Sequence, residues 1–271
     1  MNFQIKLPLS LDVSHWEPEI RWQQLSPRPV IVITKASEGK AYRDPLLAAH
    51  WAGMTSITTL RGLYHFFHPH DVSGQIANYL SQCQLVNAWD GRNWLAEIDP
   101  ILDMEYEPPA TLPRNRRPRG YVEPVRGSAL AGQIKAWLDG VENATGRRPI
   151  IYCRATGWIH TFDALGRPPA WTGDYKVWAA GYPNNPDQFA TLPDVYMPKG
   201  FREWIMWQYS ESAILPGIPF DGVDVNLINP VWLATLNVPI SPQPPIPGES
   251  PLDVLRSYEL QTLRNGEVRL T

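Results

Sequence analysis

The chain has 271 residues, of which 44% are hydrophobic and 19% are charged, a composition that fits one globular domain of barrel or sandwich size, or two small ones, and excludes disorder over most of its length. A net charge of −3 and a pI near 6.1 argue against nucleic-acid binding by bulk positive charge. No run approaches 18 apolar residues, so we expect no membrane insertion.

Two residue classes are over-represented. The 28 prolines are about twice the usual share. The 12 tryptophans and 11 tyrosines can fill a core, but they can also offer flat faces to sugars, bases or proteins.

Short apolar runs predict strands that are buried on both faces. In chain order they span 9–13, 29–35, 60–67, 101–104, 148–153, 176–180 and 204–209, and a last apolar segment, DGVDVN, covers 221–226. Between the earlier runs, apolar residues at helical spacing predict helices over 44–55, 73–88 and 128–145, the last stopped by Gly146.

This alternation predicts an α/β architecture with parallel strands, and about eight strands favour a closed barrel over an open sheet. The later strands follow one another without clear helices, so a perfect eightfold repeat is not expected. We assign residues 1–238 to the barrel, the Pro-rich segment 239–251 to a linker and residues 252–271 to a short tail or stub of a further module.

The opening residues MNFQIKLPLSLDVSHW do not form a secretory signal peptide. The protein then stays where it is made, leaves by another route or lacks its leader. Two cysteines, Cys83 and Cys153, cannot build a disulfide framework, and we expect free thiols.

Carboxylates near the ends of the predicted strands are the strongest chemical signal. Asp12 ends the first strand, Asp103 and Glu105 end another, and Asp224 lies in the last apolar segment. Catalytic side chains of α/β barrels come from such strand ends. Alternation places Asp103 and Glu105 on one side of their strand, with Met104 on the other. Their repulsion should raise the pKa of at least one, as a general acid needs.

Other interpretations of these residues exist. An isolated D-x-E also occurs on solvated strands, Glu97 and Asp99 are equally acidic, and carboxylates can bind metals. The histidines His65, His68 and His70 lack a zinc pattern, and His65 fits a hydrogen-bonded structural role better. A G-x-S-x-G elbow for serine hydrolysis is missing from the sequence. We therefore expect neither a metal nor a cofactor.

Several motifs together resemble glycoside hydrolase family 25, the Chalaropsis-type lysozymes. They occur in the family's order over about residues 9–236: Asp12-Val-Ser-His-Trp16 with Ile20 and Trp22, Lys35-Ala-Ser-Glu-Gly39 with Asp44, Gly62-Leu-Tyr-His-Phe66 with Pro69, Asp103-Met-Glu105, Ile151-Tyr152, Trp178-Ala-Ala, Trp207-Gln-Tyr209 and Val223-Asp224-Val-Asn226.

The resemblance implies a TIM-like β/α barrel with reduced helical content in the later repeats. It also implies a lysozyme (N-acetylmuramidase) that cleaves the β-1,4 bond between N-acetylmuramic acid and N-acetylglucosamine in peptidoglycan. Glu105 is then the general acid, and Asp12, Asp103 and Asp224 complete an acidic floor. We expect a monomer that acts outside the cell or on the wall; a phage-type endolysin would explain the missing leader.

The stereochemical route stays open at this stage. A direct carboxylate nucleophile needs a separation of about 5–5.5 Å from the acid, and inversion needs about 6.5–9.5 Å. We favour retention with assistance from the substrate's own acetamido group, which Asp103 would orient unless it stabilises charge at the anomeric carbon.

The aromatic residues divide into two groups. Trp51, Trp137, Trp158 and Trp204 have the spacing of core residues, whereas six others are candidates for sugar binding: Tyr64, Phe66, Tyr152, Trp178, Trp207 and Tyr209. After Glu105, the long excursion 106–126 carries Arg114, Arg116, Arg117 and Arg119; it is either a groove wall that attracts anionic wall components or a solvated loop.

Two competing functions remain. A catalytically silent barrel that binds peptidoglycan or chitin would keep the groove without needing a proton donor. An intracellular structural or partner-binding protein would have no acidic cluster at one barrel face.

Overall fold

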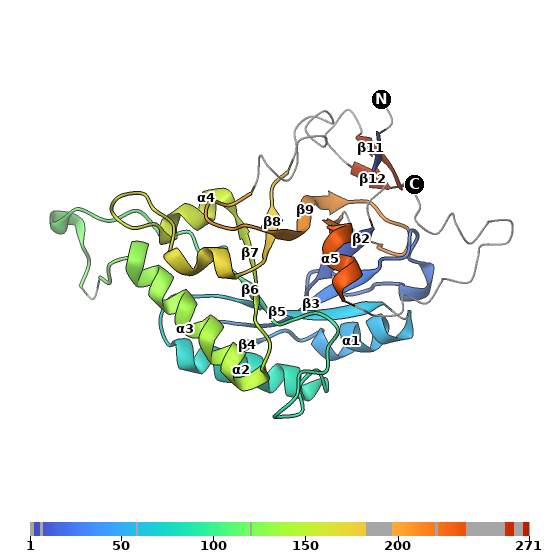
Figure 1. The fold of residues 1–271 in the computed structure, drawn as a ribbon, viewed down its shortest axis with the longest axis horizontal. Helices are drawn as coiled ribbons and strands as arrows, with labels where there is room; N and C mark the ends of the chain where they lie inside the picture. The colour runs from blue at the N-terminus through green and yellow to red at the C-terminus, as the bar shows by residue number, and fades with distance from the viewer. Residues whose placement is uncertain are drawn as a thin grey trace, which may run out of the picture.

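The computed structural model describes residues 3–5, 8–57, 59–119, 121–182, 197–219, 222–236, 258–262 and 268–270. Eight strands close into a barrel in chain order, because the first strand pairs with both the second and the last (Figure 1). They are β2 (Leu9–Val13), β3 (Ile31–Glu38), β5 (Leu60–Phe66), β6 (Ile101–Asp103), β7 (Ile150–Arg154), β8 (Val177–Ala180), β9 (Trp204–Ala213) and β10 (Val223–Ile228). A two-residue strand, β4 (Tyr42–Arg43), adds to the outer edge of β3.

One barrel strand runs against the others. The other seven barrel strands, β2, β3 and β5 to β9, are parallel to one another, whereas β10 is antiparallel to both β9 and β2. The start of β10 therefore lies at the face of the barrel where the other strands end. This reversal pairs Asp224, the second residue of β10, with Asp12 near the end of β2.

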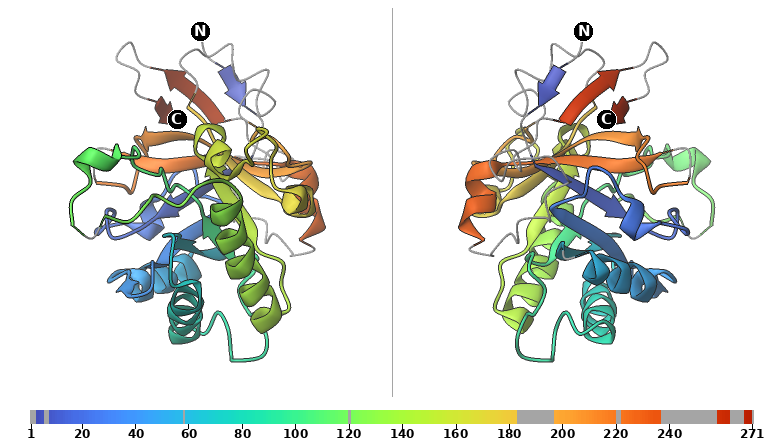
Figure 2. Two further views of the ribbon diagram at one scale, coloured as in Figure 1. Left: turned by 90° about the vertical axis from the view of Figure 1, so that its left-hand side faces the viewer. Right: turned by 90° about the vertical axis from the view of Figure 1, so that its right-hand side faces the viewer.

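The predicted long helices are confirmed as α1 (Leu47–Ser56), α2 (Val72–Leu85) and α3 (Gly127–Thr145). They cover one side of the barrel (Figure 2). The α3 helix buries the predicted apolar stripe and ends at Gly146, whose φ of +68° suits a residue without Cβ.

Helices become short in the later repeats. The segment after β7 forms α4 (Ala155–Trp158), η3 (Ile159–Thr161) and η4 (Ala170–Asp174), and β10 is followed by α5 (Pro230–Thr235). Two further turns of 3-10 helix, η1 (Trp22–Gln24) and η2 (Arg114–Arg116), lie in loops. The TIM-like barrel with reduced helical content is therefore confirmed. No helix in the described part of the chain is both long enough and apolar enough to cross a membrane.

Side-chain alternation divides the core into two layers. Ile31 and Ile33 of β3 pack inside the barrel, where they meet side chains such as Ile101 and Met206, while Val32 faces the layer under the helices. The apolar interior fills the barrel at the start of the strands. Polar side chains are left to line its other end.

Three terminal strands form a separate sheet on the side of the barrel opposite α1, α2 and α3 (Figures 1 and 2). In it β1 (Phe3–Ile5) and β12 (Val268–Leu270) flank β11 (Tyr258–Thr262), all antiparallel. The predicted linker 239–251 lies outside the described residues, and the division into barrel, linker and tail stays a prediction.

Candidate active site

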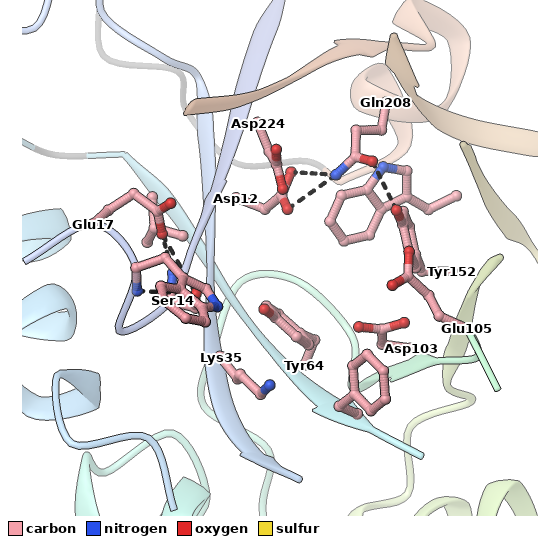
Figure 3. A pocket seen from close by; sticks show the side chains of 14 residues that line it. Asp12, Ser14, Glu17, Lys35, Tyr64, Asp103, Glu105, Tyr152, Gln208 and Asp224 are labelled. Carbon is pink, nitrogen blue, oxygen red and sulfur yellow. Dashed lines mark hydrogen bonds between the residues drawn. The ribbon is translucent and has the colours of Figure 1, made fainter. Parts of the chain in front are cut away.

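A cavity of about 300 Å³ opens at the end of the barrel where the parallel strands finish. Eight of the ten predicted site residues line it (Figure 3): Asp12, Tyr64, Phe66, Asp103, Glu105, Tyr152, Trp178 and Asp224. The strand register explains this grouping, since Asp103 pairs with both Phe66 and Tyr152, and Tyr152 pairs with Trp178.

Asp12 and Asp224, which we call the closed pair, are enclosed by hydrogen bonds. Gln208 Nε2 donates to Asp12 Oδ1 and Oδ2 at 3.1 and 3.2 Å, and Asn226 Nδ2 donates to Asp12 Oδ2 at 2.7 Å. Asp224 adds a side-chain hydrogen bond to Asp12. The oxygens of Asp12 are therefore occupied before any ligand arrives.

Aromatic donors fix the orientation of both amides. Gln208 Oε1 accepts the hydroxyls of Tyr152 at 2.7 Å and Tyr182 at 2.8 Å. Asn226 Oδ1 accepts the indole N–H of Trp178 at 2.6 Å. Since an indole N–H can only donate, the NH₂ group of Asn226 must face Asp12. Two of the predicted sugar-binding aromatics, Tyr152 and Trp178, thus also position the closed pair.

Burial governs the protonation of the closed pair. Burial, followed by the negative charge of Asp12, raises the pKa of Asp224 to about 10, so Asp224 is protonated at neutral pH. Burial raises the pKa of Asp12 to about 6, although its hydrogen bonds to Asn226, Asp224 and Gln208 oppose the shift. The pair therefore holds one proton near neutral pH.

Asp103 and Glu105, which we call the open pair, are different. As predicted, both line the cavity, whereas Met104 between them is buried in the outer core layer. Within the described residues, no hydrogen bond reaches the carboxyl group of either side chain, and Asp103 Oδ1 is buried without a partner. In Figure 3 the Glu105 carboxyl lies between Asp103 and Tyr152.

The predicted repulsion within this pair appears at Asp103. Burial and then the charge of Glu105 raise the pKa of Asp103 well above its usual range, against the opposing charge of Lys35. The neutral form of Asp103 is therefore favoured more than in an exposed aspartic acid, and its Oδ1, which has no partner within the described residues, can accept a hydrogen bond.

Besides Val13 and Ser14, four residues that were not predicted as site residues line the cavity, although Trp16, Lys35 and Gln208 lie within the sequence motifs given above. Lys35, which is buried, has its ammonium 2.6 Å from Glu38 Oε2, and Gln208 bridges to Asp12 as described above. Trp16 and Glu17 come from the loop after β2. Burial raises the pKa of Glu17 to about 7, although the backbone N–H of Ser14 lowers it. Of these four, Gln208 could have been identified from its position alone, because an amide inside a strand that is buried on both faces requires polar partners.

Two predicted sugar-binding residues do not lie in the cavity. Trp207 and Tyr209 flank Gln208 on β9, so when Gln208 points inward they point outward. Both are buried in the core layer between barrel and surrounding segments, and Trp207 Nε1 donates to the Gly181 carbonyl at 2.8 Å. The structure therefore places both side chains outside the cavity. The sequence could not show this, because a strand that is buried on both faces does not reveal which of its side chains point inward.

Other predicted features have structural roles. His65 is buried between Ser37 Oγ at 2.8 Å and Gln75 Oε1 at 3.1 Å, and burial lowers its pKa to about 4. Cys83 and Cys153 are free and buried. In the ranges that the structure describes, no three His, Cys, Asp or Glu side chains are grouped to hold a metal ion.

The excursion 106–126 projects from the cavity side of the barrel as the green loop at the left of Figure 1. Arg126 closes its base by donating to the carbonyls of Pro108 and Pro109 at 2.9 and 2.6 Å. Arg117 braces its tip through Glu123 at 2.5 Å and the Leu112 carbonyl at 2.9 Å. At least two arginines, Arg117 and Arg126, therefore stabilise the conformation of this loop.

Comparisons with known proteins agree with this geometry. The profile described as "Glycosyl hydrolases family 25" matches residues 11–218. Lysozyme M1 of Streptomyces globisporus is 25% identical over 81% of this chain and 67% of its own length, and N,O-diacetylmuramidase of a Chalaropsis species is 25% identical over 76% and 89%. The crystal structure of a bacterial lysozyme from Streptomyces coelicolor superposes with a TM-score of 0.65 at 23% identity, covering 84% of this chain and 96% of that one.

Proposed function

Because the chain belongs to glycosyl hydrolases family 25 and is thus a glycoside hydrolase, we propose that it is a lysozyme that hydrolyses the β-1,4 bond between N-acetylmuramic acid and N-acetylglucosamine in peptidoglycan. The names of the similar proteins, a lysozyme and a muramidase, support this substrate. The observation that carries the mechanism is the open pair: two adjacent carboxyl groups that line the cavity without hydrogen bonds from the described residues.

In the proposed first step, Glu105 delivers a proton to the glycosidic oxygen and the bond to the anomeric carbon breaks. The carbonyl oxygen of the substrate's acetamido group forms the new bond to that carbon. Asp103 Oδ1, buried without a partner, accepts the acetamido N–H and holds this group in line. Glu105 gives up its proton, and the positive charge that develops on the acetamido group stabilises the negative charge left on the open pair.

In the second step, water attacks the anomeric carbon, and the bond between this carbon and the acetamido oxygen breaks. Glu105 takes a proton from the attacking water, which restores the pair and releases a sugar with a new reducing end. The closed pair takes no bond-forming part, because the oxygens of Asp12 already accept hydrogen bonds. It gives the floor of the cavity its shape and its negative charge.

Product analysis on purified cell walls tests this function. Reducing ends are labelled by borohydride reduction, and mass spectrometry identifies the sugar that carries the label. The proposal expects reduced N-acetylmuramic acid; reduced N-acetylglucosamine would indicate a glucosaminidase. If no reducing ends form while the protein binds walls, the catalytically silent binding barrel is the correct alternative.

The matched variants for this assay are Glu105→Gln and Glu107→Gln. Glu107 is exposed two residues further along the same segment. Glu105→Gln should release few or no reducing ends, and Glu107→Gln should match the wild type. Action on the bacterial wall follows from the proposed substrate, while the monomeric state and the export route stay predictions.

A further inference from the structure

The loop that follows β2 presents a tryptophan at the rim of the cavity. Trp16 lines the cavity and is 75% exposed, the largest exposed fraction of any large hydrophobic side chain in the described residues. Single exposed hydrophobic side chains are common on protein surfaces. The surroundings of Trp16 must therefore show whether its exposure serves a purpose.

The loop holds Trp16 firmly. Glu17 N donates to the Ser14 carbonyl at 3.0 Å, Ser14 N donates to Glu17 Oε2 at 2.7 Å, and Trp16 N donates to Ser14 Oγ at 3.3 Å. This closed turn fixes the backbone on both sides of the indole.

The imidazole ring of His15 packs against the indole of Trp16. The ring centroids of Trp16 and His15 are 4.6 Å apart with planes inclined by 37°. His15 is itself anchored, because its backbone N–H donates to Asp44 Oδ2 at 3.0 Å and its ring lies 3.3 Å from the same oxygen. The Asp44 side chain is fully buried. Trp16 is thus an exposed flat surface on a rigid base, which loses little conformational freedom when a ligand covers it.

Glu17 adds a polar contact beside this surface. Its Oε2 is held by Ser14, and no hydrogen bond within the described residues uses its Oε1. In Figure 3, Glu17 lies on the opposite side of the cavity from Asp103 and Glu105. A sugar hydroxyl or amide N–H can therefore donate to Glu17 while the apolar face of its ring covers Trp16.

The charge of this side selects the kind of sugar. The closed pair and Glu17 make it acidic, and the charges of Asp12 and Asp44 both act on Glu17. A carboxylate on the ligand would be repelled here. Of the two peptidoglycan sugars, only N-acetylglucosamine carries neither a lactyl group nor a stem peptide, whose free carboxylates this side would repel.

We propose that Trp16 and Glu17 form a subsite for a neutral N-acetylglucosamine ring, on the side of the cavity opposite the open pair. The choice of ligand rests on the proposed function. The subsite itself rests on an exposed, supported indole and an unused carboxylate oxygen.

Binding of chitotetraose, a neutral oligomer of N-acetylglucosamine, tests the subsite by titration calorimetry. The titrations use protein carrying Glu105→Gln, so that the oligomer is not cleaved. Adding Trp16→Ala should weaken binding by about tenfold or more, because the aromatic contact is lost. Trp16→Phe keeps a flat ring and should stay within about threefold. The matched control is Leu165→Ala, which removes a side chain that is 74% exposed and does not line the cavity.

The subsite is overturned if the Glu105→Gln protein does not bind chitotetraose, if Trp16→Ala binds as well as its parent, or if Leu165→Ala weakens binding equally. Failure of the proposed function has a different signature. A wild-type protein that releases no reducing ends from walls, yet binds chitotetraose through Trp16, would have the subsite without the muramidase activity.

Discussion

Two pairs of carboxyl groups share one cavity, and their hydrogen bonds differ completely. Asp12 of the closed pair accepts bonds from two amides, which two aromatic residues hold in orientation. Asp103 of the open pair is just as buried, but Oδ1 has no partner in the described residues. Burial raises pKa values in both pairs. A raised pKa therefore does not by itself identify the reacting groups; the unused hydrogen-bonding capacity does.

The comparison also concerns stability. A buried polar atom without a partner costs about 1–3 kcal/mol. In the closed pair, the amides of Gln208 and Asn226 donate to Asp12 and remove this cost. In the open pair, Asp103 Oδ1 has no donor within the described residues until a substrate supplies one. Substitution of Asp12 should therefore lower the stability of the fold, whereas substitution of Asp103 should not.

The largest effect is expected for Asp103→Asn. The substitution removes the carboxyl group that is proposed to hold the substrate's acetamido group beside Glu105, and kcat for reducing-end release should fall by about 10²–10³-fold. Thermal unfolding at pH 7 should show no loss of stability, because the raised pKa of Asp103 makes the wild-type carboxyl unfavourable there. A variant with near wild-type kcat would remove Asp103 from the mechanism.

Asp12→Asn should act mainly on stability. The new NH₂ group replaces one of the two acceptor oxygens, so Gln208 or Asn226 loses the acceptor of its buried N–H group, at a cost of about 1–3 kcal/mol. Urea unfolding measures the difference, and Asp139→Asn, which breaks an exposed pair with Lys135, serves as the control. An unchanged urea midpoint for Asp12→Asn would contradict the role of the closed pair.

Asp224→Asn should instead stabilise the fold at neutral pH. The pKa of Asp224 rises from 3.8 to about 10 on folding, so wild-type stability falls as pH rises from about 4 to about 10, where only the unfolded state releases the proton. Asparagine can still donate to Asp12 and does not titrate. The gain, about 1–2 kcal/mol at pH 7, should vanish near pH 3. A gain that is independent of pH would point to another cause.

The smallest effect on activity is expected for Trp207→Phe. Its side chain packs outside the barrel, so KM for walls should stay within about twofold while unfolding stability drops by about 1 kcal/mol through the lost bond to Gly181. Trp178→Phe is the matched variant inside the barrel and should raise KM or lower kcat, since Asn226 loses its orienting donor. Equal kcat and KM values for the two variants would contradict the claim that Trp178 acts on the site and Trp207 does not.

Much of the barrel could be predicted because local patterns determine it. Apolar runs marked seven of the eight barrel strands, the apolar segment 221–226 overlaps the eighth, β10, and helical spacing with Gly146 marked α3. The direction of β10 could not be read from these patterns, because pairing direction depends on contacts between distant segments. The prediction of Asp224 nevertheless succeeded, since the reversal of β10 brings its start to the same face of the barrel.

Which side chains of a strand point into the cavity could be predicted for one strand but not for another. In Asp103-Met-Glu105 the charged residues mark the inward side, because neither suits the apolar layer under the helices. In Trp207-Gln-Tyr209 three large residues can all be buried, and hydrophobicity does not reveal which side faces the cavity. Trp16 and Glu17 were not predicted as site residues for another reason. Their positions depend on a loop that is closed by hydrogen bonds to Ser14 and anchored by Asp44, which lies 28 residues after Trp16 along the chain.

The central claim is that the bond is cleaved by two successive displacements at the anomeric carbon beside the open pair, the first by the substrate's own acetamido oxygen and not by water. Proton NMR of the first products from a soluble peptidoglycan oligomer, recorded before mutarotation, tests it most directly. Two displacements at the anomeric carbon, first by the acetamido oxygen and then by water, predict that the β-anomer forms first. First formation of the α-anomer would show a single displacement by water and would contradict the account.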